Sequence, residues 1–422
     1  MGAQPGDCID SNTFTLPSHE SESLSAQQSA ERISQHFASI SQEFPPLDVN
    51  NLPARVRTKL LCTDTPPAVT EYEAYRKIIG AKTVTGEWPS SWKLEHVVPI
   101  GKMTSPETED DLRPISLTPF FSKVTEHFVV GWLMSYIKDK IDFRQYGGQK
   151  GNSITHYLIE FITFILSCQD STDQTAILAV MVDFSKAFNR QNHNLLIIKL
   201  SDMGVPAWLL RVVIGFLKDR HMVLRYKGKL SKMKYLPGGG PQGTLLGLLL
   251  FIILINDVGF EDQKNNLGDI LTSKRNMKQA NEIHLKYVDD LTLAEAINLP
   301  SQLVSDPNRL QPDCFHGRTG HVLPETNSLV CQQLVKTADF AEQNDMKINN
   351  TKTKAMLFNA CKSIDFMPKI RLENHEVEVV EEIKLLGITI RSDLKWSSNT
   401  QNLVQKANKR LWIIRRLSLI HI

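Results

Sequence analysis

The sequence predicts a mixed fold of α-helices and β-strands, on three observations. The apolar run "AILAVMV" at 176–182 has the length of a buried strand and ends abruptly in Asp183. The apolar run "LLGLLLFIILI" from Leu245 is too short to span a membrane, which needs roughly 20 residues. It therefore predicts a buried helix. The stretch "MVLRYKGKLSKMKYL" predicts a hairpin that turns at Lys227-Gly228. With 41% hydrophobic and 22% charged residues over 422 positions, the chain has the composition of a globular protein.

The two ends of the chain differ in charge. Residues 1–54 are acidic and rich in Ser and Gln, and we expect a flexible segment in which "ESLSAQQSAERISQHFASI" could form one amphipathic helix. Residues 394–422 carry six basic residues and no acidic one, although the net charge of the whole chain is only +2. This asymmetry is typical of a protein that binds a partner, and a solvated helix face is the plainer alternative.

Further elements follow along the chain in the order expected of a mixed fold. A helix is predicted from Thr65, where Pro residues precede apolar positions at helical spacing. Two polar stretches, 258–283 and 298–326, resemble insertions, and no internal repeat is visible. The other predicted elements are a strand from Leu94, a helix from about Ser122, two helices in 192–204 and 206–219, a helix in 331–346, a strand in 354–360 and a hairpin in 377–390.

Cysteine usage and the N-terminus bear on the compartment. The six cysteines are scattered without a CxxC pair, which argues against a zinc ribbon and a disulfide scaffold and favours a reducing compartment. The N-terminus lacks the charged-then-apolar pattern of a signal peptide. We therefore expect an intracellular protein, in the nucleus or cytoplasm, that does not bind a membrane.

The stretch "KYVDDLTLAE" places Asp289 and Asp290 side by side between apolar neighbours. Successive side chains of a strand point to opposite faces, and burying an unpaired carboxylate is costly. A tight turn that exposes both acids is the plain reading, and a divalent metal that neutralises them is the other. Asp183 alone would be read as a cap or turn residue. Together the three suit two-metal phosphoryl transfer, which needs carboxylates from separate strands.

Four motifs in order make the chain resemble a known family. They are "LRPISLT", "VDFSKAF", "GGPQGTLLG" with "LLFIILINDV", and "YVDD". Together they resemble the reverse transcriptase of non-LTR (LINE-type, jockey-like) retrotransposons, over roughly residues 65–422. The resemblance implies a right-hand polymerase that copies RNA into DNA. It implies fingers at 55–175, a palm built on an antiparallel sheet at 176–393, and a truncated thumb at 394–422.

The resemblance also implies the catalytic residues. Asp183, Asp289 and Asp290 would be the catalytic carboxylates and would bind Mg²⁺, with Mn²⁺ as an alternative. The backbone carbonyl of Phe184 would be a further metal ligand. The partners would be an RNA template, a DNA primer and dNTPs, and the oligomeric state is left open.

Other positions match residues that bind the nucleotide and the nucleic acid. Phe188 would be the sugar gate that excludes a 2′-hydroxyl, with a core Phe as the alternative reading. Lys102 and Arg113 would grip the triphosphate, although isolated basic residues are usually surface groups. Gln242 and Gly243 would contact the incoming nucleotide and the template, and Lys352 would lie near the leaving pyrophosphate. The first thumb helix would contact the phosphate backbone through Lys406, Lys409, Arg410, Arg415 and Arg416.

The chain departs from the family pattern at several places. Asn189 follows the gate where the family has Asp, and Leu248 replaces a Pro. A longer fingers segment is missing between Ala81 and Gly86, and the chain stops at Ile422 inside the expected thumb. We therefore expect weakened activity. The alternatives are a non-catalytic remnant that binds nucleic acid, and a misfolded product without function.

Overall fold

The computed structural model describes residues 25–64, 86–102, 105–170, 175–259, 282–298, 328–359, 369–373 and 375–420. The chain divides into two compact units. Unit 1 comprises Met1–Asp142, Lys186–Asp257 and Gln343–Lys347, and unit 2 comprises Phe143–Ser185, Val258–Glu342 and Ile348–Ile422. Both units combine helices with sheets, which confirms the predicted mixed class. The expected borders of fingers, palm and thumb stay a prediction.

Unit 1 is built on a mixed five-stranded sheet. Strand β1 pairs antiparallel with β2 and parallel with β4, and β4 also pairs antiparallel with β5 and β6. The predicted turn is confirmed: Lys227 and Gly228 both have positive φ, which suits the right-handed twist of a two-residue hairpin. The strands are β1 (Leu94–Gly101), β2 (Leu112–Leu117), β4 (Arg220–Tyr226), β5 (Lys229–Leu230) and β6 (Lys234–Leu236).

Helix α1 (Ala26–Ser41) packs on this sheet, so the expectation of a flexible segment is wrong for this part of residues 1–54. Ser25 caps the helix and forms a capping box with Gln28. Ala30, Ile33 and Phe37 are buried in one cluster with apolar residues of β1 and β4. The burial of three apolar side chains on one helix face explains why a Ser- and Gln-rich stretch is ordered.

The remaining helices of unit 1 pack mainly against one another. The predicted buried helix is α9, and almost all of its residues are buried. The side chain of Thr244 caps its N-terminus. Helix α9 contacts α5 and α7, and α8 contacts α7, α5 and α2. The helices are α2 (Ala54–Leu60), α4 (Ser90–Lys93), α5 (Phe120–Ile137), α7 (His193–Asp202), α8 (Ala207–Leu217) and α9 (Leu245–Leu254).

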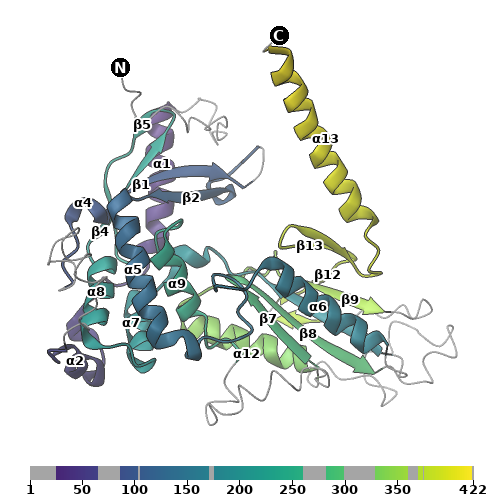
Figure 1. Ribbon diagram of the computed structural model, residues 1–422, viewed down its shortest axis with the longest axis horizontal. Coiled ribbons are helices and arrows are strands. Elements are labelled where there is room, and N and C mark those ends of the chain that lie inside the picture. Colours follow the sequence, from purple (N-terminus) through teal and green to yellow (C-terminus); the bar gives the residue numbers. More distant parts are fainter. Residues whose placement is uncertain are drawn as a thin grey trace. The chain divides into compact units, whose positions relative to one another are not determined.

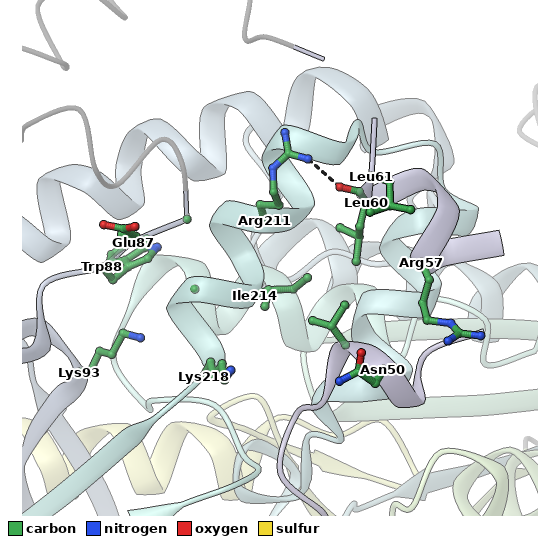
Figure 2. Close-up of a pocket in the computed structure, with 13 residues that line it drawn as sticks. Asn50, Arg57, Leu60, Leu61, Glu87, Trp88, Lys93, Arg211, Ile214 and Lys218 are labelled. Carbon is green, nitrogen blue, oxygen red and sulfur yellow. Dashed lines mark hydrogen bonds between the residues drawn. The ribbon is translucent and has the colours of Figure 1, made fainter. Parts of the chain in front are cut away.

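A cavity of about 850 Å³ lies beside α2 and α8. Figure 2 shows Arg211 on α8 reaching toward α2, where its guanidinium donates to the carbonyl of Leu60 at 2.9 Å. Ile214 and Leu61 give the cavity apolar walls, and Lys93 and Lys218 add positive charge. Burial, followed by neighbouring cations, lowers the pKa of Lys93, while Asp219 opposes this.

Unit 2 contains a five-stranded sheet in the order β12-β9-β3-β8-β7. The predicted strand at 176–182 is confirmed as β3, the central strand, and all of its residues are buried. Strand β3 pairs antiparallel with β8 and with β9, and β8 continues antiparallel to β7. The strands are β3 (Thr175–Val182), β7 (Glu282–Tyr287), β8 (Asp290–Asn298), β9 (Lys354–Asn359) and β12 (Glu378–Val379).

Two helices belong to this unit. Helix α6 (Ile154–Gln169) lies across the sheet in Figure 1 and buries Tyr157 and Phe161 in one cluster with residues of β3, β7 and β9. Helix α12 (Leu329–Gln343) is fastened at its N-terminus. There the buried Glu295 of β8 accepts hydrogen bonds from the Ser328 hydroxyl and from the backbone N–H of Leu329.

The C-terminal part of unit 2 is a pair of small hairpins and a long helix. The hairpin predicted within 377–390 is confirmed by β13 (Glu382–Leu385) and β14 (Ile388–Arg391). Strands β10 (Arg371–Leu372) and β11 (His375–Glu376) form the other hairpin. Helix α13 (Ser397–Ile420) follows, contacts β14, and is exposed along residues 401–412.

Some predictions lie outside the described residues. The helix expected from Thr65 falls there, as do most of the two polar stretches, 258–283 and 298–326. Within the described ranges, no helix is long and apolar enough to cross a membrane.

Candidate active site

Strand pairing brings Asp183 and Asp290 together in unit 2. Val182, the last residue of β3, pairs with Leu291 of β8. Asp183 directly follows β3 and Asp290 is the first residue of β8, so both lie at the same end of this strand pair. The sheet therefore brings together two carboxylates that are more than a hundred positions apart in sequence.

Asp289 lies in the turn that joins β7 to β8. Tyr287 pairs with Asp290 across this turn, and Val288 has a φ of 59°, an uncommon conformation for a β-branched residue. The side chain of Gln145 supports the strained turn, because its Oε1 accepts from the backbone N–H of Val288 at 2.9 Å. The same oxygen accepts from Gly147 at 3.0 Å. The turn is thus held by a segment distant in sequence.

The electrostatics of Asp290 show that the three carboxylates interact. Burial, followed by the charges of Asp289 and Asp183, raises the pKa of Asp290 to about 6. A carboxylate among other carboxylates favours protonation because like charges repel. A bound cation would relieve this repulsion.

A turn formed by residues 349–353 holds the backbone of Asp183. The N–H of Asn349 donates to the Asp183 carbonyl at 2.7 Å, and the N–H of Asp183 donates to the Thr353 hydroxyl at 3.3 Å. Phe184 forms an isolated antiparallel bridge with Ile348. Lys352 lies exposed in this same turn, so the structure places it beside the strand end that carries Asp183.

Oxygen ligands from carboxylates suit Mg²⁺ and Mn²⁺, so the donor chemistry of Asp183, Asp289 and Asp290 fits a divalent metal. The structure holds no preassembled cage: among the described residues, no group of three His, Cys, Asp or Glu side chains is arranged to hold a metal ion. Mg²⁺ commonly keeps several waters and takes only one or two carboxylates, together with substrate phosphates.

Unit 1 carries the residues expected to meet the nucleotide. The ring of Phe188 is half-buried and stacks on Phe251 of α9, with centroids 4.8 Å apart. The backbone N–H of Gly240 donates to the carbonyl of Phe188 at 2.8 Å. Gln242 accepts from the N–H of Ser116 through its own carbonyl at 2.8 Å, and Gly243 is exposed with a φ of 103°.

Lys102 and Arg113 lie at one end of the β1–β2 hairpin. Lys102 directly follows β1, and Arg113 pairs with Ile100 in the register of the two strands. The amino group of Lys102 donates to the carbonyl of Asp110 at 2.6 Å, and Arg113 is exposed. The hairpin therefore brings the two cations to one end of the sheet in unit 1.

The basic residues of α13 lie on a solvent-exposed helix. Lys406, Lys409 and Arg410 are exposed, as is Arg415 further along. Leu403, Leu411 and Ile414 are exposed as well, and Arg410 shares a helix face with Leu403 and Ile414 because residues four and seven positions apart lie on one face. The side chain of Arg416 lies outside the described residues.

A family comparison accounts for this arrangement. The family model for reverse transcriptase (RNA-dependent DNA polymerase) matches residues 100–390. The chain belongs to the reverse transcriptase family. The match includes every candidate residue from Lys102 to Lys352 and leaves out only those of α13.

Curated relatives of this chain come from mobile elements. A probable RNA-directed DNA polymerase from transposon BS of Drosophila melanogaster is 24% identical over 338 residues, which are 78% of this chain and 33% of the relative. The RNA-directed DNA polymerase from mobile element jockey of the same species is 22% identical over 336 residues, 78% of this chain and 32% of that protein. The chain therefore spans about a third of the length of these relatives.

Among solved structures, the chain is similar to telomerases. Telomerase from Candida tropicalis in complex with a fragment of telomeric RNA matches with a TM-score of 0.42 and 12% identity, covering 78% of this chain and 48% of that one. A Candida albicans telomerase matches with the same score and identity, covering 78% and 50%. Membership of the reverse transcriptase family rests on the family match and not on this structural likeness.

Sequence reasoning missed several residues that support the three aspartates. Gln145 and Gly147 hold the Val288 turn, and Asn349 and Thr353 hold Asp183. The buried hydroxyl of Tyr157 donates to Thr292 of β8 at 2.6 Å. The residues of "QYGGQ", which include Gln145 and Gly147, could have indicated a supporting turn. Their partners could not be predicted, because they depend on strand pairing.

Proposed function

We propose that this chain is an RNA-directed DNA polymerase that adds dNTPs to the 3′-hydroxyl of a DNA primer on an RNA template. One observation carries the proposal. Asp183 follows β3 at the end of the strand pair where Asp290 begins β8, and the charges of Asp289 and Asp183 both raise the pKa of Asp290. Carboxylates from separate strands are the arrangement that metal-assisted nucleotidyl transfer needs.

Asp183, Asp289 and Asp290 would hold Mg²⁺ or Mn²⁺, with the backbone carbonyl of Phe184 as a further ligand. The bound ions would supply charge neutralisation at the leaving pyrophosphate and a lower pKa for the primer hydroxyl. The turns at 288–289 and 349–353 orient the carboxylates. Asp290 must be ionised to act as a ligand, and a bound cation favours that form.

The other candidate residues act on the nucleotide. Lys102 binds the triphosphate through its single ammonium charge, and Arg113 binds it through the planar guanidinium, which can donate two parallel hydrogen bonds. Phe188 lies against the deoxyribose and disfavours a 2′-hydroxyl, and its stacking on Phe251 holds the ring in one orientation. The loop with Gln242 and Gly243 contacts the incoming base, and Lys352 stabilises the leaving pyrophosphate.

Nucleic acid is held by dispersed charges. Lys406, Lys409, Arg410, Arg415 and Arg416 of α13 bind the phosphate backbone in a salt-dependent manner. Dispersed contacts tolerate damage better than catalysis does, because a misplacement of about 1 Å can cost about 100-fold in rate. We therefore expect secure binding of template and primer and weak, poorly processive extension. An enzyme of this kind would act inside the cell, in the nucleus or cytoplasm.

A primer-extension assay on an RNA template, run beside a template-binding assay, tests the proposal. Extension that depends on Mg²⁺ and dNTPs supports the polymerase. Binding without extension, even after a longer fingers segment is added, would contradict it and indicate a non-catalytic remnant. A folded chain that shows neither binding nor extension would contradict both functions.

A further inference from the structure

Helix α1 contacts the glycine-rich loop at residues 238–243 through a reciprocal pair of hydrogen bonds. The Ser41 hydroxyl donates to the Gly238 carbonyl at 2.5 Å and accepts from the Gly238 N–H at 3.0 Å. Ser41 is the last residue of α1, and only 3% of its surface is exposed. One side chain therefore satisfies both backbone groups of the loop's first glycine.

The loop is also bound to the segment that carries Phe188. Gly239 donates to the carbonyl of Gln191 at 2.9 Å, and Gly240 donates to the carbonyl of Phe188 at 2.8 Å. The ring of His193 is 2.7 Å from the Gly239 carbonyl through its Nε2. Residues 188–193 and the loop thus form one hydrogen-bonded scaffold within unit 1.

The C-terminal turn of α1 and the residues just after it fasten both parts of that scaffold. A Cβ added at Gly238 would lie 2.7 Å from the ring of Phe44, so the loop passes directly over this buried ring. Glu43 pairs with the guanidinium of Arg190 at 2.5 Å, two residues beyond Phe188. Ser41, Glu43 and Phe44 therefore contact the loop and the Phe188 segment together.

We propose that Ser41 is a positioning residue, which holds the loop of Gln242 and the segment of Phe188 in the geometry that receives the incoming nucleotide. The role of these two elements rests on the proposed function, whereas their attachment to α1 does not. At Gly238 the loop passes too close to Phe44 for a Cβ, so hydrogen bonds to its backbone hold this part of the loop. Loss of the Ser41 hydroxyl leaves two buried backbone groups of Gly238 without that partner.

Hydrogen exchange of the full chain tests the attachment directly. In Ser41→Ala we expect amides of residues 238–240 to exchange about 3- to 10-fold faster, as loss of a buried hydrogen bond implies. Strand β3 should exchange as before. Ser39→Ala is the matched control, since Ser39 is exposed on the same helix and its hydroxyl donates to the His36 carbonyl at 2.8 Å. Ser41→Thr, which keeps the hydroxyl, should restore slow exchange.

Nucleotide kinetics test the consequence. Ser41→Ala should raise KM for dNTP about 3- to 10-fold, with kcat and RNA affinity unchanged. Equal exchange in Ser41→Ala and Ser39→Ala, or faster exchange throughout the chain, would overturn the proposal. If Ser41→Ala does not fold, Glu43→Gln takes its place, and it should speed exchange at 186–190 and 238–240 alone. If the wild-type chain does not extend a primer, the proposed function is contradicted. The hydrogen-exchange result still decides whether Ser41 holds the loop.

Discussion

Asn349 donates its backbone N–H to the carbonyl oxygen of Asp183 at 2.7 Å. This bond ties the end of the central strand β3 to the turn that precedes β9. The hydroxyl of Thr353, from the same turn, accepts from the N–H of Asp183 at 3.3 Å. Both backbone groups of a proposed catalytic residue are therefore held by one short segment.

Thr353→Val should loosen Asp183. Thr353 is fully buried, and Val keeps its shape while removing the oxygen that accepts from Asp183. We expect the free energy of unfolding to fall by about 1–3 kcal/mol, because the N–H of Asp183 loses its partner in a part-buried hydrogen bond. Urea titration measures this loss. Thr351→Val is the control, since Thr351 is exposed in the same turn. Equal stability of the two variants would contradict the assignment.

Gly147→Ala should disturb the turn that carries Asp289. A Cβ at Gly147 would lie 2.6 Å from both the backbone nitrogen and the Cγ2 of Val288, closer than real contacts allow. We expect a loss of about 1–3 kcal/mol in the free energy of unfolding, the usual cost of overpacking. Gly131→Ala on α5 meets nothing within 4 Å and should be neutral or slightly stabilising. The prediction fails if both variants unfold at the wild-type urea concentration.

Phe188→Ala should relax the choice of sugar. Removing the ring opens the space that a 2′-hydroxyl would occupy, so incorporation of rNTP relative to dNTP should rise by about tenfold or more. Single-nucleotide extension with each substrate measures the ratio. Phe251→Leu removes the stacking partner, whose ring lies 4.8 Å away, and keeps the Phe188 ring. The ratio of rNTP to dNTP incorporation should change less in Phe251→Leu than in Phe188→Ala. An unchanged ratio in an active Phe188→Ala enzyme would remove the sugar-gate assignment.

His193 should make unit 1 sensitive to acid. The pKa of His193 is lowered to about 4, because burial and, less strongly, the Arg220 charge outweigh the hydrogen bond to Gly239, which raises it. Because the unfolded chain binds the proton more readily, the stabilisation is complete above about pH 6.5 and is lost as pH falls toward 4. We expect a loss of about 1–2 kcal/mol by pH 5.

Urea titrations at pH 7 and pH 5 measure this dependence. His193→Gln can still donate to the Gly239 carbonyl but does not titrate, so its stability should change less between the two pH values. His127→Gln, an exposed substitution on α5, is the matched control. A loss in His193→Gln as large as that of the wild type would show that other groups cause it.

Local sequence patterns predicted the elements that lead to the aspartates. The apolar run before Asp183 is β3, the turn at Lys227-Gly228 has the conformation expected of it, and the apolar run from Leu245 is α9. Each of these depends on residues close together in sequence, for which apolar runs and turn residues carry clear signals.

Contacts between distant segments could not be predicted in the same way. Helix α1 buries the small polar residues Ser34 and Ser41 alongside Ile33 and Phe37, so its composition resembles that of a tail. The hydrogen bond from Val288 to Gln145 spans 143 positions and depends on how the edge of β7 is covered. Such partners follow from the tertiary arrangement, not from the period of the local pattern.

Incorporation of a single dNTP on a primed RNA template by aspartate variants tests the central claim most directly. Asp183→Asn, Asp289→Asn and Asp290→Asn should each lower the rate by at least about 100-fold while RNA affinity stays within about twofold. Asp139→Asn, an exposed acid of unit 1, is the control and should retain the wild-type rate. Wild-type incorporation by any of the three active-site variants would contradict the claim that these carboxylates act together in nucleotidyl transfer.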